Sequence, residues 1–283
     1  MTSTSPARIA RPSTSLPSNP LPPVLKLGLH RVTYELRRYI RKPDAWFFTF
    51  AFPIVLLGIF SLAFEGQDLG GGVTGASYYL PAMLASGILT IGTQNLGIHM
   101  AEERYDDTRK RLAGTPLSPA SYLMGKIGQV FIMGAIQAAL LVLIAHFVFD
   151  VALPTDNHRW VTFAWVLFAG LVTSTIVGIA VSQLPRSARS ASSVVTPVVL
   201  VLQFVSGVFL PFSLMPQWLQ HAAGIFPLRW LAQGMRSVFL PDSMASLEIG
   251  GSWNLGGIAL VLGLWLVLGT MVARAMFRWI PRG

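Results

Sequence analysis

Six long apolar stretches constrain the fold of this chain more than any other feature. Each approaches the roughly 20 residues that a helix needs to cross a hydrocarbon core. The stretches cover residues 46–64, 79–101, 127–149, 160–183, 191–214 and 254–277. They are continuous and do not alternate with polar residues, so they predict helices and not a barrel. With only 12% charged residues, the chain is predicted to be an all-α polytopic membrane protein with six transmembrane helices.

The distribution of Lys and Arg predicts the orientation of these spans, because basic residues concentrate in short cytosolic loops. With a cytosolic amino terminus, every Lys and Arg except Arg159, Arg229 and Arg236 falls in an inner segment. We therefore expect a multi-pass protein of the cytoplasmic (inner) membrane with both termini cytosolic. The net charge of +9 is interpreted as orientation and attraction to anionic membrane lipid, and not as a sign of nucleic-acid binding.

The amino-terminal segment divides into a tail and a helix. Residues 1–23 are rich in Pro, Ser and Thr and contain no acid, a composition that predicts a disordered cytosolic tail. Residues 24–283 are then the six-span transmembrane domain. Arg31, Glu35 and Arg38 share one face of the helix that follows the tail, and apolar residues share another, so we expect an amphipathic helix on the inner membrane surface. It either anchors the chain only or also contacts a cytosolic subunit.

A charged segment over residues 105–119, closed by Pro116 and Pro119, separates the second and third apolar stretches. It is the largest polar feature of the chain, so we expect a short cytosolic helix that a soluble partner can contact. The candidate contact residues are Glu102, Glu103, Arg104, Arg109, Lys110, Arg111 and Leu112. Glu102 and Glu103 are expected to be solvated at a helix end. A metal site with His99 is rejected, because a second His one turn away is missing.

The cores of the six apolar stretches contain no Asp, Glu, Lys or Arg, since Arg274 lies near the end of the sixth, and this argues against an ion-coupled transporter. They also lack a catalytic constellation, which disfavours a membrane-embedded enzyme, and the chain has no cysteine for a thiol nucleophile. Neutral polar residues do occur, and they indicate either helix packing or a solute path. The candidate path residues are Thr90, Gln94, Thr196, Gln203 and Ser206.

The outer segment between the fifth and sixth stretches is predicted to contain two short helices, near residues 217–223 and 228–239. Their sequence is too apolar for a solvated loop, so re-entrant or interfacial placement is expected. Arg229 and Arg236 share a face at a spacing of seven residues. We interpret both as anchors for lipid phosphates.

Two sequence regions resemble motifs of one transporter family. The loop 102–112, followed by Thr-Pro-Leu-Ser-Pro at 115–119, is similar to a coupling helix, and residues 206–219 with 226–228 are similar to an outer gate. Both are typical of the membrane subunit of type-2 ABC exporters, which include daunorubicin-resistance and polysaccharide or teichoic-acid export permeases. The resemblance covers nearly the whole chain after Leu25. The implied gate residues are Pro211, Pro216, Trp218, Pro227 and Arg236.

This resemblance implies a permease and not an enzyme. The only Gly-Lys pair, Gly125-Lys126, lacks the upstream glycine of a P-loop, so ATP and Mg are expected on a separate ABC ATPase subunit and no cofactor on this chain. A second permease copy is implied, in a homodimer or a heterodimer. The expected substrate is an amphipathic drug-like, lipid or lipid-linked molecule exported across the membrane, as in multidrug efflux and antibiotic resistance. The alternative is a polysaccharide or teichoic acid.

Overall fold

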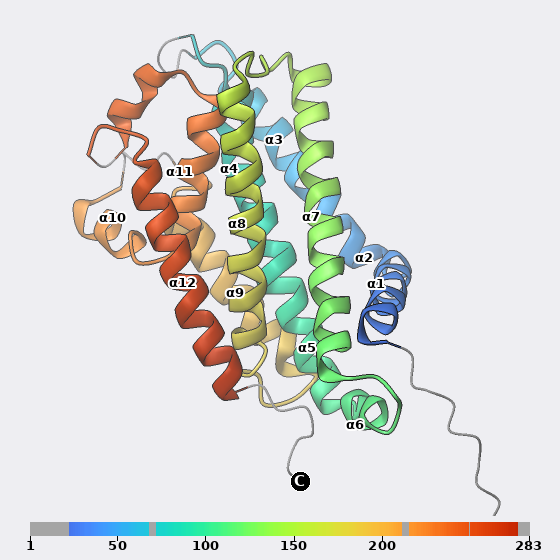
Figure 1. Cartoon of the computed structure of the whole chain (residues 1–283). Helices are drawn as coiled ribbons and strands as arrows, with labels where there is room; N and C mark the ends of the chain where they lie inside the picture. The colour runs from blue at the N-terminus through green and yellow to red at the C-terminus, as the bar shows by residue number, and fades with distance from the viewer. Residues whose placement is uncertain (1–22, 68–71, 211–214, 249, 277–283) are drawn as a thin grey trace, which may run out of the picture.

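A computed structural model describes residues 23–67, 72–210, 215–248 and 250–276, and all regular structure in these ranges is helical (Figure 1). The all-α prediction is therefore confirmed. The predicted disordered tail lies outside the described residues apart from Pro23, and so do Pro211 of the predicted gate and the last two arginines of the chain.

The helices follow in chain order. The first half comprises α1 (Val24–Ile40), α2 (Pro43–Trp46), the π-helix η1 (Phe47–Ala51), α3 (Phe52–Ala63), α4 (Gly75–Leu89), the π-helix η2 (Thr90–Asn95), α5 (Leu96–Tyr105) and α6 (Thr108–Ala113). The second half comprises α7 (Pro119–Phe149), α8 (Asn157–Val181), α9 (Ser190–Val205), α10 (Gln217–Ala223), α11 (Pro227–Phe239), the 3-10 helix η4 (Asp242–Leu247) and α12 (Leu255–Met276).

Three of the described helices are long and apolar enough to cross a membrane by length and composition, namely α7, α8 and residues Leu255–Ala275 of α12. Phe47–Ala63 and Ser190–Val205 are shorter apolar helices. Helix α4 is buried along nearly its whole length and contacts α3, α7, α8 and α11, as expected for a helix that is apolar on all sides. It forms the centre of the bundle.

The start of the third helix and the end of the fifth are the predicted boundaries that differ most from the structure. The third helix begins at Pro119 and not near residue 127, because the Ser118 hydroxyl accepts the Ser121 backbone N–H at 3.1 Å and proline suits the first helical position. Lys126 is therefore inside a helix and not in a loop. The fifth helix ends at Val205, before the predicted residue 214, because the chain turns at Gly207 with a φ of 74°.

Small residues allow the close crossing of η2 and α8. A Cβ atom added to Gly178 would lie 2.1 Å from the carbonyl oxygen of Gly92, so only glycine fits there. Thr93 donates to the Ser174 carbonyl at 3.0 Å in the same crossing. Close backbone approach of this kind is how small residues join helices in membranes, and it fixes the position of η2 within the bundle.

Candidate functional site

Helix α1 packs across the half of α7 that lies nearer α6 (Figure 1). Its charged face is turned inward: Arg31 and Glu35 are buried, whereas Leu25 and Leu29 are exposed. Gly125 makes the close approach possible, because an added Cβ there would lie 2.2 Å from Cγ of Arg31. The outward apolar edge suits a helix at a membrane surface, and the inward charges require partners within the protein.

The inward charges pair with one another and with residues of α5 and α7. The Lys126 ammonium donates to Glu35 Oε2 at 2.9 Å and to Glu103 Oε1 at 2.8 Å. Arg31 Nη2 lies 2.6 Å from Glu35 Oε1, and Arg38 donates to Glu103 Oε1. We call these five residues, Arg31, Glu35, Arg38, Glu103 and Lys126, the inner ionic cluster. It joins three helices that are distant in sequence.

The prediction that Glu103 is solvated is wrong, since its side chain is only 1% exposed. Burial by itself raises the pKa of this carboxyl. The attraction of Lys126 and hydrogen bonds from Lys126 and Tyr122 outweigh burial and hold the pKa well below its ordinary value. Glu103 is therefore charged at neutral pH, and its contribution to stability is lost only as the pH falls through that lowered pKa. Glu102 remains 30% exposed beside His99 and Lys42.

The charged helix α6 follows directly on α5. Lys110 is 50% exposed and pairs with Asp107 at 2.8 Å, and Arg111 is also exposed. Arg109, in contrast, is buried, and Leu112 packs on the hydrophobic core. The four candidate contact residues on α6 therefore divide into an exposed pair, Lys110 and Arg111, and a pair that packs inside, Arg109 and Leu112, which corrects the expectation of a wholly solvated helix.

Arg104 fixes the base of this segment to the loop between α8 and α9. It donates to Gln183 Oε1 at 2.8 Å and to the Pro185 carbonyl at 2.5 Å. Tyr105 donates to the same carbonyl at 2.9 Å. At the α6 end of the bundle, α5 is therefore joined to α1 and α7 by the inner ionic cluster and to the loop between α8 and α9 by Arg104 and Tyr105.

Four of the five candidate path residues lie together between η2 and α9. Gln94 Nε2 donates to Thr196 Oγ1 and Gln203 Nε2 donates to Thr90 Oγ1, both at 3.3 Å. They line a cavity of about 190 Å³, which we call the polar cleft. Its other lining residues are Phe48, Phe52, Pro53, Leu56, Met83, Ser86, Asn95 and Leu200. Ser206 is buried and does not line the cleft.

A hydrogen-bond network that the sequence analysis missed lies beside the cleft. Asn95 Nδ2 donates to Thr49 Oγ1 at 2.9 Å and to the Tyr39 hydroxyl at 3.2 Å, and Tyr39 and Thr49 are themselves hydrogen bonded. The network joins α1 to both π-helices. Such widened helical turns occur frequently at functional sites. The network was not predicted because Asn95 is 46 residues from Thr49 and 56 residues from Tyr39 in the sequence.

The interpretation of Arg229 and Arg236 as lipid anchors is wrong, because both side chains are buried. Arg236 Nε donates to Glu248 Oε1, and Arg229 Nη2 lies 4.0 Å from Glu248 Oε2. The two predicted outer helices are present as α10 and α11, and they begin at Pro216 as N-cap and Pro227 as first helical residue. Trp218 is exposed.

An all-helical bundle with long apolar helices and a charged segment at one end is the architecture of an integral membrane protein. The family described as "ABC-2 family transporter protein" matches residues 65–273. The chain therefore belongs to the ABC-2 family of transporters.

Two curated relatives agree with this assignment. The chain is 23% identical over 212 residues to the inner membrane transport permease YadH of Escherichia coli (strain K12), covering 73% of this chain and 80% of YadH. It is 24% identical over 202 residues to the "Probable multidrug ABC transporter permease YbhR" of the same organism, covering 71% of this chain and 52% of YbhR. Both relatives are named as transport permeases.

Proposed function

We propose that this chain is the membrane subunit of an ATP-driven exporter of the cytoplasmic membrane. It works with a separate ABC ATPase subunit, which binds ATP and Mg, and with a second permease copy. The observation that carries this proposal is the inner ionic cluster, which joins α1, α5 and α7 directly beside α6. A partner that moves α6 would therefore move a braced unit, because breaking a buried ion pair costs about 3–5 kcal/mol.

Helix α5 connects α6 to the polar cleft. Helix α5 continues without a break into η2, which supplies Thr90 and Gln94 to the cleft. On the other side, Tyr39 of α1 bonds to Asn95 of η2. A displacement of α5 or α1 would therefore change the separation of η2 from α9 and open or close the cleft.

The chemistry of the cleft favours an amphipathic substrate. Phe48, Leu56 and Met83 supply apolar surface, whereas Gln94 and Gln203 supply neutral hydrogen-bonding groups. Such a lining suits drug-like molecules, lipids or lipid-linked molecules, and the name of YbhR supports multidrug efflux. The alternative cargo is a polysaccharide or teichoic acid, since amide groups also bind sugar hydroxyls. Uptake into inverted vesicles that contain the permease and its ATPase, with one cargo of each class, separates the two.

Replacing Gln94 or Gln203 by Leu tests the role of the cleft. Each change removes a 3.3 Å hydrogen bond to a threonine hydroxyl, so we expect a loss of unfolding free energy below about 1.5 kcal/mol. If the cleft holds substrate, the ratio of transport rates for two unlike substrates changes several-fold. Melting temperature and both rates are measured together. An equal loss for both substrates that follows the melting temperature would assign these residues to helix packing alone.

Cysteine labelling tests the proposed six-span topology with cytosolic termini, because the natural chain has no cysteine. Ala120 and Ser246 are both exposed. Ala120 lies in the first turn of α7, which follows the predicted cytosolic loop, and Ser246 lies in η4, in the predicted outer segment. An impermeant thiol reagent added to intact cells is expected to label the Ser246→Cys variant and not the Ala120→Cys variant. Both variants should react after the cells are opened. Labelling of Ala120→Cys in intact cells would contradict the proposed cytosolic position of the start of α7.

A further inference from the structure

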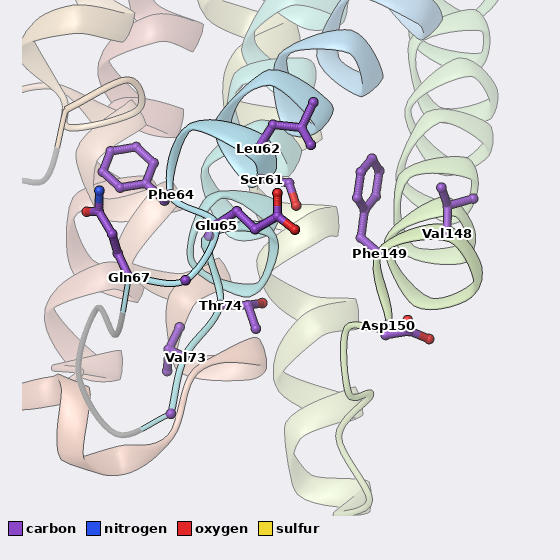
Figure 2. Close-up of a pocket in the computed structure, with 13 residues that line it drawn as sticks. Ser61, Leu62, Phe64, Glu65, Gln67, Val73, Thr74, Val148, Phe149 and Asp150 are labelled. Carbon is purple, nitrogen blue, oxygen red and sulfur yellow. The ribbon is translucent and has the colours of Figure 1, made fainter.

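A second cavity, separate from the polar cleft, lies where α3 and α7 end. It has a volume of about 610 Å³, within the range of about 300–1,000 Å³ typical of small-molecule sites. We call it the outer pocket. Figure 2 shows the carboxylate of Glu65 directed toward Phe149, with Asp150 at the end of α7. Neither the sequence motifs nor the proposed transport path includes these residues.

Part of the lining of the outer pocket is apolar, namely Leu62, Phe64, Val73, Val148 and Phe149. Phe64 and Phe149 are half-buried, whereas the side chains of Leu62 and Val148 are highly exposed. Exposed leucine and valine on the outer surface of a membrane bundle face hydrocarbon. An apolar chain can therefore extend from the pocket along α3 and α7 into the surrounding lipid.

The electrostatic potential of the pocket is negative. Its lining contains the carboxylates of Glu65 and Asp150 and no Lys, Arg or His, and among the described residues neither carboxylate has an ion-pair partner. Helices α3 and α7 both direct their carboxyl-terminal ends at it, and these ends carry partial negative charge. The amino terminus of α4 also borders it, but Thr74 caps that end by accepting the Ser77 N–H at 3.2 Å.

The carboxylate of Asp150 lies next to the carboxyl-terminal end of a helix, on a residue with positive φ. Asp150 has a φ of 52° and stands directly after the last turn of α7. A negative charge at a helix carboxyl terminus is unfavourable, and a positive φ is uncommon for a residue other than glycine, although aspartate tolerates it. A ligand with a positive charge would relieve the repulsion between this carboxylate and the helix end.

We infer that the outer pocket binds the ammonium group of an amphipathic amine, whose apolar chain lies along Leu62 and Val148. Glu65 and Asp150 supply the counter-charge, and Phe149 offers a ring face that attracts cations. The amine can come from an amine-headed membrane lipid or from a soluble cationic amphiphile. This site does not depend on transport or on the ATPase, so it is tested on the isolated permease.

The test uses the full-length permease in a non-ionic maltoside detergent with dodecylamine that carries a photoreactive diazirine in its chain. Mass spectrometry locates the adducts, which are expected in residues 61–67, 72–75 and 148–150. A probe with the same chain and a hydroxyl headgroup should label these residues weakly. Equal labelling by both probes in the natural chain overturns the inference, and this comparison is independent of any variant's folding.

Substitutions then identify the charges. Combining Glu65→Gln with Asp150→Asn is expected to weaken labelling by the amine about tenfold, the scale of two exposed carboxylate–ammonium contacts. The matched control, Glu65→Asp with Asp150→Glu, keeps both charges and should keep the labelling. If phosphatidylethanolamine reduces labelling by the amine probe, the site is assigned to lipid. If dodecyltrimethylammonium reduces it and phosphatidylethanolamine does not, the site is assigned to soluble cations. Unchanged labelling in the neutral variant contradicts the assignment of these carboxylates.

Discussion

The Glu103→Gln variant is expected to lose about 3–5 kcal/mol of unfolding free energy, the cost of breaking a buried ion pair from one side. Glu103 accepts hydrogen bonds from Lys126 and Tyr122 and pairs with Arg38. A neutral amide cannot balance the two cations, and Glu35 would remain as the only carboxylate of the inner ionic cluster. The thermal unfolding midpoint of the purified permease and its yield in the membrane measure the loss.

Two further variants separate the cluster from a general effect of the substitution. Glu102→Gln makes the same change one residue earlier, at a side chain that is 30% exposed, and should cost less than about 1 kcal/mol. Combining Glu103→Gln with Lys126→Met removes one of the uncompensated buried cations, so it should recover part of the lost stability. Similar midpoints for Glu102→Gln and Glu103→Gln would show that the cluster does not brace the fold.

The helical elements were largely predictable because membrane helices have a strong composition signal. The long apolar stretches gave α7, α8 and α12, and prolines with apolar periodicity gave α10 and α11. The start of α7 was also readable, since Ser118 followed by Pro119 is a capping signal. Lys126 was predicted in a loop because basic residues next to an apolar stretch usually lie in cytosolic loops, whereas it lies inside α7.

The partners of buried charges were not predictable from local sequence. Lys126 meets Glu35 across 91 residues and Glu103 across 23, so only the tertiary packing of α1 on α7 shows that all three are buried together. For Arg229 and Arg236 the seven-residue spacing correctly predicted a shared helix face. It could not show that this face turns inward, because their partner Glu248 lies on a later loop.

The candidate path illustrates both outcomes. Polar residues at helical spacing correctly indicated the faces that bring Gln94 to Thr196 and Gln203 to Thr90. The same argument included Ser206, which lies at the turn after α9 and does not reach the cleft. Periodicity does not predict where a helix stops. Here α9 ends at Val205, and the chain turns at Gly207, which has a positive φ.

Reversing the exposed charges of α6 is the most direct test of the proposed coupling. Lys110→Glu combined with Arg111→Glu should reduce ATP-driven transport and the stimulation of the partner ATPase by about tenfold or more, because like charges placed across an interface cost several kcal/mol. The fold should be unaffected, because Lys110 is 50% exposed and, within the described residues, its ion pair is with Asp107 in the same exposed segment. Arg109 and Leu112 are left unchanged because they pack inside.

The matched control makes the same reversal at Arg186 and Arg189, which are exposed in the loop between α8 and α9. Arg104 and Tyr105 tie this loop to the base of α6, so the control lies at the same end of the bundle and changes the net charge equally. If α6 is the contact, its reversal reduces copurification and stimulation of the ATPase by about tenfold or more. The control retains most of both, and both variants melt like the natural chain. Equal losses in the two variants would mean that the partner responds to the net charge of this end of the bundle, and α6 would have no special role in coupling.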